Sequence, residues 1–169
     1  MPRRGRPTPT IQMDGVFPLT LDAVWGLLHA HLDEATLREI HPWILDGRVV
    51  REGERVPFGD LTFPPEKVAE REIRLMGRKF RTTWTYAIEP PSRFAYEIRF
   101  ENGSTSRFGN TYAAVPRGTF VKTVGEFSIK GVPNFVGTWA TRRLLDRADE
   151  EDLAYARKAE GRPERYQKG

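Results

Sequence analysis

The sequence predicts a single α+β domain in which a curved antiparallel sheet of about seven strands is covered on its concave face by a long C-terminal helix. Three observations lead to this fold class. A helical pattern follows the first strand, the middle of the chain alternates with the period of a strand, and the last long element is again helical. The 169 residues are enough for one domain. We expect that domain at residues 8–157, with disordered charged tails at 1–7 and 158–169.

A strand is predicted from about Thr8 to Val16, and two short helices follow it. The second helix is predicted from Asp33 to about Ile40, because Pro42 disfavours helical backbone at His41. In the first helix, apolar residues recur at helical spacing and share one face: Leu21, Val24, Trp25, Leu28 and Leu32.

Between Ile44 and Lys130 the pattern is that of antiparallel strands. Aromatic and branched residues alternate with polar ones over residues 80–88 and 94–100, as they do in half-buried strands. Asn102–Gly103, between two such runs, predicts a hairpin turn. The proline-rich segment 57–65 predicts a long connection instead. The short turns between the other runs predict a meander of sequential strands.

The last element is predicted to be a helix from about Asn134 to Arg157. A sheet of the predicted length must curl, and this helix is the only predicted element long enough to cover its concave face. In its second half the apolar stripe moves around the helix, which predicts a bend or a different packing there. In its first half we expect the apolar side to face the sheet: Val132, Phe135, Val136, Trp139 and Ala140.

Three segments carry a resemblance to known proteins: Phe17–Leu28, Leu37–Ile44 and Asn134–Leu145, which read FPLTLDAVWGLL, LREIHPWI and NFVGTWATRRLL. They resemble the entry to the first helix, the exit from the second helix and the start of the closing helix in the SRPBCC superfamily. That superfamily includes START lipid-transfer domains, birch-pollen-allergen-like proteins and polyketide cyclases/dehydrases. The resemblance covers about residues 8–157. It implies a helix-grip fold whose cavity, between sheet and long helix, takes lipids, sterols, polyketides or other apolar molecules.

We therefore predict binding or transport of a small apolar molecule, lipid-like or polyketide-like, in this cavity. The predicted inward positions are unusually aromatic, which is typical of small-molecule pockets, although the same rings would also fill a solid core. Asn110 is the sharpest polar candidate because a buried amide needs a partner; Thr82 and Thr123 are weaker ones. The predicted ligand-binding residues are Phe80, Trp84, Tyr86, Tyr96, Phe108, Asn110, Tyr112, Phe127, Phe135 and Trp139.

Two other functions stay open. A cyclase/dehydrase-type enzyme needs an acid or base in the same cavity, and we assign no catalytic residue. An interaction protein, co-chaperone-like or tethered to DNA, is the other alternative. Arg4, Gly5, Arg6 and Pro7 resemble the core of an AT-hook, in which glycine lets an extended backbone enter the minor groove. Four residues match easily by chance in an arginine-rich chain, so we expect a solvated tail and no nucleic-acid binding.

The sequence shows no local spacing of metal ligands and no cofactor motif, so we expect neither a metal nor a cofactor. His29 and His31 are two residues apart on one helix and do not share a face, and His41 beside a proline is more often structural than a general base. The chain has no cysteine, and no stretch approaches the roughly 20 apolar residues of a membrane span. We expect a cytoplasmic monomer or homodimer with a mixed surface of net charge +4.

Overall fold

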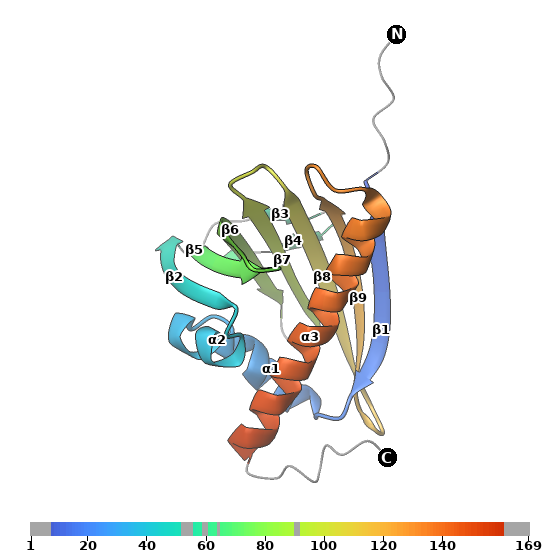
Figure 1. The fold of residues 1–169 in the computed structure, drawn as a ribbon. Coiled ribbons are helices and arrows are strands. Elements are labelled where there is room, and N and C mark those ends of the chain that lie inside the picture. The colour runs from blue at the N-terminus through green and yellow to red at the C-terminus, as the bar shows by residue number, and fades with distance from the viewer. Residues whose placement is uncertain (1–7, 52–55, 59–60, 64, 90–91, 161–169) are drawn as a thin grey trace.

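The computed structural model describes residues 8–51, 56–58, 61–63, 65–89 and 92–160 (Figure 1). Its main sheet has seven antiparallel strands in the order β1-β9-β8-β7-β6-β5-β2, so β5 to β9 form the predicted meander. The predicted fold class is therefore confirmed. The strands of this sheet are β1 (Thr10–Phe17), β2 (Ile44–Arg51), β5 (Pro65–Leu75), β6 (Arg78–Glu89), β7 (Arg93–Phe100), β8 (Thr105–Val115) and β9 (Gly118–Ser128).

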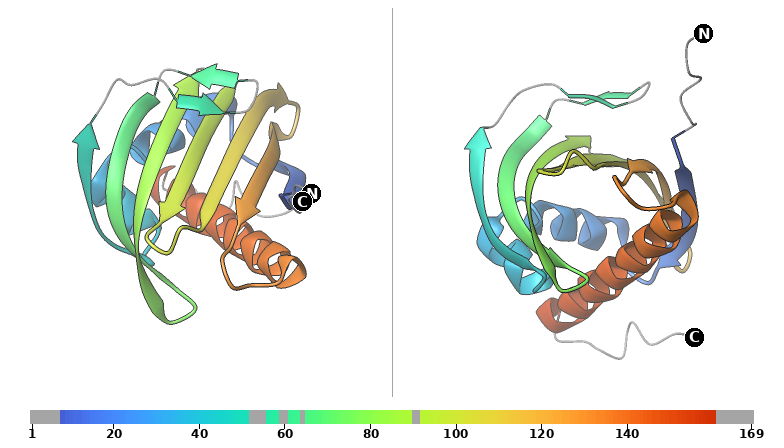
Figure 2. Two further views of the ribbon diagram at one scale, coloured as in Figure 1. Left: turned by 90° about the horizontal axis from the view of Figure 1, so that it is seen from above. Right: turned by 45° about the horizontal axis from the view of Figure 1, so that its top comes forward.

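Three helices lie on the concave side of this sheet: α1 (Leu21–Ala30), α2 (Glu34–Ile40) and α3 (Asn134–Glu160). The sheet curls, and α3 crosses its open side from the β1/β9 edge toward α2, while α1 and α2 close one end (Figures 1 and 2). The first turn of α2 is capped by Asp33, whose carboxylate accepts a hydrogen bond from the backbone N–H of Thr36 at 2.8 Å. Asp33 is thus the N-cap of the predicted second helix.

The predicted connection at 57–65 is wrong, because this segment contains two short strands. β3 (Val56–Phe58) and β4 (Leu61–Phe63) pair with each other in a separate two-stranded sheet. This small sheet lies on the convex side of the main one (Figure 2). Proline is tolerated in such a ribbon because each strand has a free edge, so a missing N–H need not break the ladder.

The C-terminal helix runs three residues further than predicted, to Glu160. In this last turn Lys158 forms an exposed ion pair with Glu39 of α2, with 3.3 Å between Nζ and Oε1. Residues 158–160 of the predicted C-terminal tail are therefore helical. The rest of that tail, and the AT-hook-like residues of the predicted N-terminal tail, lie outside the described residues.

The most deeply buried residues of α3 are small or polar, while Leu144 and Leu153 are partly buried against the core, and this mixture explains the shifting apolar stripe. Thr141, Asp152 and Ala156 are buried, and so is Gly137. A Cβ at Gly137 would lie 2.9 Å from Cε2 of Phe127 on β9, so only glycine lets the helix approach this closely. The two large aromatic residues in the first half of the helix point away instead. Phe135 and Trp139 are 77% and 62% exposed, and the prediction that they face the sheet is wrong.

Candidate ligand-binding site

A continuous wall of aromatic side chains covers the concave face of β6, β7 and β8. Cross-strand partners put rings side by side: Tyr86 faces Tyr96, and Tyr96 faces Phe108. The Tyr96 and Phe108 rings are 5.2 Å apart between centroids, and the Trp84 and Tyr96 rings are stacked at 6.2 Å with 12° between their planes. The wall therefore presents flat ring faces as well as edges.

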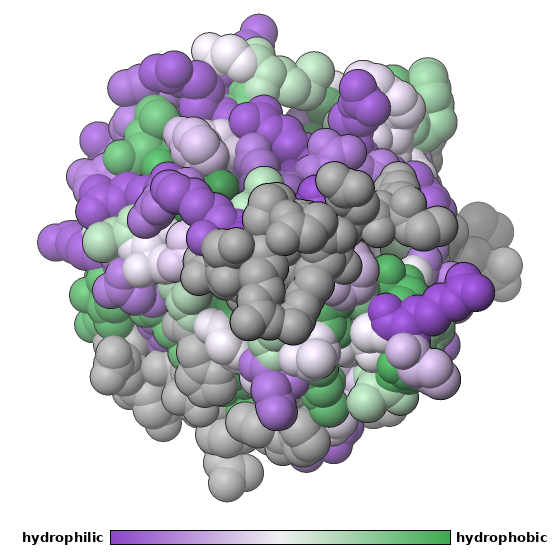
Figure 3. Space-filling model, turned by 90° about the horizontal axis from the view of Figure 1, so that it is seen from below, coloured by the Kyte–Doolittle hydropathy of each residue, from purple (hydrophilic) through white to green (hydrophobic). Residues whose placement is uncertain are grey.

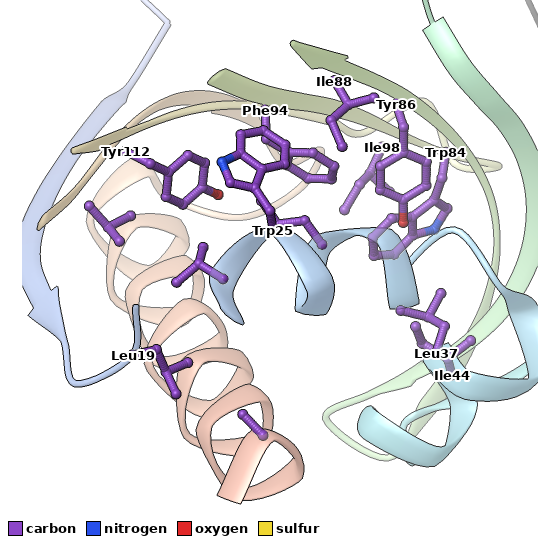
Figure 4. Close-up of a cluster of buried hydrophobic side chains, with 14 of the residues drawn as sticks. Leu19, Trp25, Leu37, Ile44, Trp84, Tyr86, Ile88, Phe94, Ile98 and Tyr112 are labelled. Atoms are coloured by element: carbon purple, nitrogen blue, oxygen red, sulfur yellow. The ribbon is translucent and has the colours of Figure 1, made fainter. Parts of the chain in front are cut away.

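The helix α1 supplies one further ring to this wall. Trp25 points toward the sheet beside Tyr112 and Phe94 (Figure 4). Its ring meets that of Tyr112 edge-on, with 5.8 Å between centroids. Sequence reasoning missed Trp25 and Phe94 as members of the wall, although both are apolar residues in periodic patterns. Helical spacing marked Trp25 as buried without showing which sheet residues it contacts.

Eight of the ten predicted ligand-binding residues lie on the strands that form the concave side. Trp84, Tyr86, Phe108, Tyr112 and Phe127 are buried, and Phe80, Tyr96 and Asn110 are half-buried. The other two, on α3, face outward as described above.

Asn110 is the polar group whose hydrogen bonding is incomplete. Its Nδ2 donates to the hydroxyl of Tyr112 at 3.1 Å. Its Oδ1 is buried and has no hydrogen-bond partner among the residues that the structure describes. Thr82 differs, because its hydroxyl donates to the backbone carbonyl of Arg71 at 2.9 Å and accepts from Nε1 of Trp84 at 2.7 Å. Of these two candidates, Asn110 is the one with an unused acceptor.

Two histidines and two carboxylates form a second polar group, where α1, α2 and α3 meet. Asp152 Oδ1 lies 2.8 Å from Nε2 of His31 and 3.3 Å from Nε2 of His41. The other ring nitrogen of His41, Nδ1, lies 2.8 Å from Oε2 of Glu151. Trp43 donates from Nε1 to the same oxygen at 2.9 Å. Residues 31, 41 and 152 are far apart in sequence, so no local spacing rule could have found this cluster.

Burial and charge shift the pKa values of this cluster in opposite directions. Burial raises the pKa of Asp152, but the neighbouring His31 and His41 outweigh it and bring the value down to about 2. Burial lowers the pKa of His41, and the hydrogen bonds and charges of Asp152 and Glu151 raise it above its ordinary value overall. Asp149, one turn earlier on α3, has its pKa raised to about 7 by burial and by the charges of Asp152 and Asp146.

The charges of two acids on α3 act on the tyrosines of the aromatic wall. Burial raises the pKa of Tyr96 well above its usual range, and the charge of Asp149 is the second largest cause. Burial also raises the pKa of Tyr112, and the charges of Asp152 and Asp149 add to this, against the Asn110 hydrogen bond. The α3 carboxyl groups therefore act electrostatically on Tyr112, to which Asn110 is hydrogen-bonded.

A buried ion-pair group joins α2 to β5. Glu34 accepts from Arg71 through Nε at 3.0 Å and Nη2 at 2.6 Å, and its Oε1 lies 2.9 Å from Nζ of Lys67. The Arg71 guanidinium stacks 4.9 Å from the ring centroid of Trp84 and also donates to the hydroxyl of Tyr86. The guanidinium therefore positions one end of the aromatic wall.

A hollow of about 550 Å³ opens across β2, β5, β6 and β7. Its lining is largely charged, with Arg48, Glu70, Arg81 and Arg99 among the residues. It is thus a different place from the apolar interior at Asn110, and its chemistry does not suit an apolar ligand. The face seen from below is also largely hydrophilic where its atoms are visible, with hydrophobic residues in small areas (Figure 3). No helix among the described residues is long and apolar enough to cross a membrane.

No family model matches the sequence, and no curated protein matches it. Solved structures do match the chain, and they show its fold. It has the helix-grip fold of SRPBCC/START-like proteins. Ara h 8.0201 is 14% identical with a TM-score of 0.66, over 89% of this chain and 98% of that one. The Zhui aromatase/cyclase from Streptomyces sp. R1128 is 12% identical with a TM-score of 0.69, over 90% and 96%. A START superfamily protein from Mycobacterium smegmatis is 9% identical with a TM-score of 0.66, over 89% and 98%.

Proposed function

We propose that this protein binds a small apolar molecule against the aromatic wall, and that Asn110 Oδ1 accepts a hydrogen bond from it. The observation that carries the proposal is the buried Oδ1 on the concave face, which has no hydrogen-bond partner in the described part of the chain. Leaving a buried acceptor unpaired costs about 1–3 kcal/mol, and a ligand that donates a hydrogen bond removes this cost. The ligand we infer is therefore apolar over most of its surface and carries at least one donor.

The ring geometry favours a flat, aromatic or polyketide-like molecule over a flexible chain. Trp84 and Tyr96 present nearly parallel ring planes, and an aromatic ligand gains most from such a surface. The likeness to an aromatase/cyclase fold agrees with this ligand class. Because the rings contact one another, binding includes a rearrangement of side chains, and Trp25 is the ring we expect to move, since α1 is not part of the sheet.

The fluorescent probe 8-anilinonaphthalene-1-sulfonate tests this site, since it is aromatic and carries an N–H donor. We expect saturable binding of one probe per chain with a change in tryptophan fluorescence. Trp139→Ser on the exposed side of α3 is the control, and it should leave the affinity unchanged. Loss of probe binding in Trp139→Ser would place the probe on the surface and contradict the proposal.

Native mass spectrometry of freshly purified protein, followed by solvent extraction, tests for a natural ligand. We expect an apolar passenger of defined mass that denaturation releases. A protein that carries no passenger and also does not bind the probe would count against a binding function.

A second candidate function, an enzyme of the cyclase/dehydrase type, is favoured by one observation. Asp149 has its pKa raised to about 7, mainly by burial, and its charge helps to raise the pKa of Tyr96 in the aromatic wall. A carboxyl group with this pKa can give or take a proton at neutral pH. Cyclisation of a short poly-β-ketone thioester should then be faster with the protein than without it, and Asp149→Asn should lose most of the gain. Equal rates with and without the protein would reject this candidate.

A further inference from the structure

Three polar side chains come together where the ends of α1 and α2 meet α3. His31 follows the last turn of α1, His41 is the C-cap of α2, and Asp152 lies in the second half of α3. We propose that His31, His41 and Asp152 form a binding site for one divalent transition-metal cation, with Zn²⁺ as the best fit. This inference stands independently of the proposed apolar ligand.

The positions of the three ligand atoms fit a single cation. The nitrogen and oxygen atoms that these residues offer all lie within 4.8 Å of one another. Zinc bonds to nitrogen and oxygen are about 2.0–2.2 Å long, which puts neighbouring ligand atoms of a tetrahedral site about 3.3 Å apart. Asp152 Oδ1 and His41 Nε2 already have this separation of 3.3 Å, and Oδ1 and His31 Nε2 are 2.8 Å apart. Two of the three pairs of ligand atoms are therefore close to the separation that a tetrahedral site needs, and the third pair, from His31 and His41, lies within 4.8 Å.

A second observation, the anchoring of His41, independently points to a metal ligand. A carboxylate, Glu151, holds its far ring nitrogen, Nδ1, at 2.8 Å, which leaves Nε2 directed at Asp152. Glu151 is itself fixed, because it accepts from Nε1 of Trp43 at 2.9 Å and from Nε of Arg147 at 2.8 Å. A carboxylate on the far nitrogen of a ligating histidine is the usual outer-shell arrangement of protein metal sites.

The donor set selects the class of cation. Two imidazole nitrogens and one carboxylate oxygen suit Zn²⁺ and its first-row neighbours, whereas Mg²⁺ and Ca²⁺ prefer oxygen ligands throughout. The side chains of His31, His41 and Asp152 are only 12%, 6% and 12% exposed. Three protein ligands leave at least one coordination position for water or another small molecule, as in catalytic zinc sites. The carboxylate of Glu151 adds negative charge beside His41.

Isothermal titration of chelator-treated protein with Zn²⁺ tests the site. We expect one Zn²⁺ per chain. Asp152→Asn and His41→Gln should each weaken binding by roughly 10–100-fold or more, and Glu151→Gln should weaken it by a smaller factor in this range. Glu150→Gln is the matched control, since it removes an exposed carboxylate from the same helix and should leave affinity unchanged. Equal affinity of the wild type and the two ligand variants would mean adventitious surface binding and would overturn the proposal.

A measurement on the wild-type protein keeps the proposal testable if the variants fail to fold. In ¹⁵N-histidine NMR spectra, one equivalent of Zn²⁺ should shift Nε2 of both His31 and His41, while Nδ1 of His41 keeps its proton. Co²⁺ should give the intense visible absorption of a four- or five-coordinate site. No imidazole shift with Zn²⁺ and an unchanged cobalt spectrum would contradict a metal site at these residues.

Discussion

Trp84 donates its indole N–H to the hydroxyl oxygen of Thr82, two residues earlier on the same strand, at 2.7 Å. The Thr82 hydroxyl in turn donates to the backbone carbonyl of Arg71 at 2.9 Å. Thr82→Val keeps the side-chain volume but leaves the buried indole N–H without this partner. We expect a loss of about 1–3 kcal/mol of unfolding free energy in urea titrations. Thr111→Val, at an exposed position of β8, should stay within about 0.5 kcal/mol of wild type.

The close contact between α3 and β9 at Gly137 predicts opposite effects of alanine at two helical glycines. Gly137→Ala places a methyl group 2.9 Å from the buried Phe127 ring, and this overpacking should lower the free energy of unfolding by about 1–3 kcal/mol. The higher helix propensity of alanine offsets up to about 1 kcal/mol of this loss. Gly26 in α1 has nothing within 4 Å of an added Cβ, so Gly26→Ala should stabilise the protein by about 0.5–1 kcal/mol. Thermal melts of both variants check the pair. Equal gains at the two positions would contradict the tight helix–strand contact.

The ion pair between Glu34 and Arg71 predicts a loss of stability in acid. Burial raises the pKa of Glu34, but hydrogen bonds from Arg71 and Lys67 outweigh it and hold the value below its ordinary 4.5. A depressed pKa contributes stability above the unfolded value, and this contribution is lost as the pH falls through the folded value, below about pH 4.5. Glu34→Gln should flatten this part of the stability profile and cost roughly 3–5 kcal/mol at neutral pH, since two buried cations lose their anion.

The exposed pair of Glu70 and Arg48 provides the matched control for Glu34. Its oxygen and nitrogen atoms are 2.7 Å apart, but the side chains are 50% and 77% exposed. Glu70→Gln should therefore change the unfolding free energy by less than about 1 kcal/mol at any pH. If the free energy of unfolding of Glu34→Gln and of the wild type fell in the same way with decreasing pH, the buried pair would not be the cause of the loss of stability in acid.

The raised pKa of Asp149 predicts the opposite pH dependence of stability. Its folded pKa of about 7 lies above the ordinary 3.8, so between these values the folded state holds a proton that the unfolded state has released. Stability contributed by this proton therefore falls as the pH rises from about 4 to about 7. Asp149→Asn should gain about 1–3 kcal/mol over wild type at pH above 7, and little in acid. Urea titrations across this range, with chelator present, check the sign.

The fold followed from the sequence because its determinants are local. Alternation over β6 and β7, the Asn102–Gly103 turn and the periodic face of α1 each depend on residues close in the chain. The small sheet of β3 and β4 was missed because its prolines also fit a connection. The orientation of α3 was missed because the bulkiest residues were expected inside, whereas close packing at Gly137 requires small ones there.

The candidate site was predictable in part for the same reason. The strand period placed the aromatic wall and Asn110 on one face, since side chains alternate strictly along a strand. It could not show that Thr82 is fully hydrogen-bonded while Asn110 is not, because this depends on the side-chain conformations of Trp84 and Tyr112, two residues away on the same strands. The cluster of His31, His41 and Asp152 is assembled by three helices, and only the tertiary fold brings these residues together.

The central claim, that the unpaired Oδ1 of Asn110 serves a ligand, is tested most directly by Asn110→Leu. This change removes the unpaired acceptor while nearly keeping the side-chain volume. Unfolding free energy and affinity for 8-anilinonaphthalene-1-sulfonate should be measured on the same sample. The account predicts stability within about 1 kcal/mol of wild type or above it, together with at least a roughly tenfold loss of affinity. A large loss of stability with unchanged affinity would contradict the account, because Asn110 would then be a structural core residue.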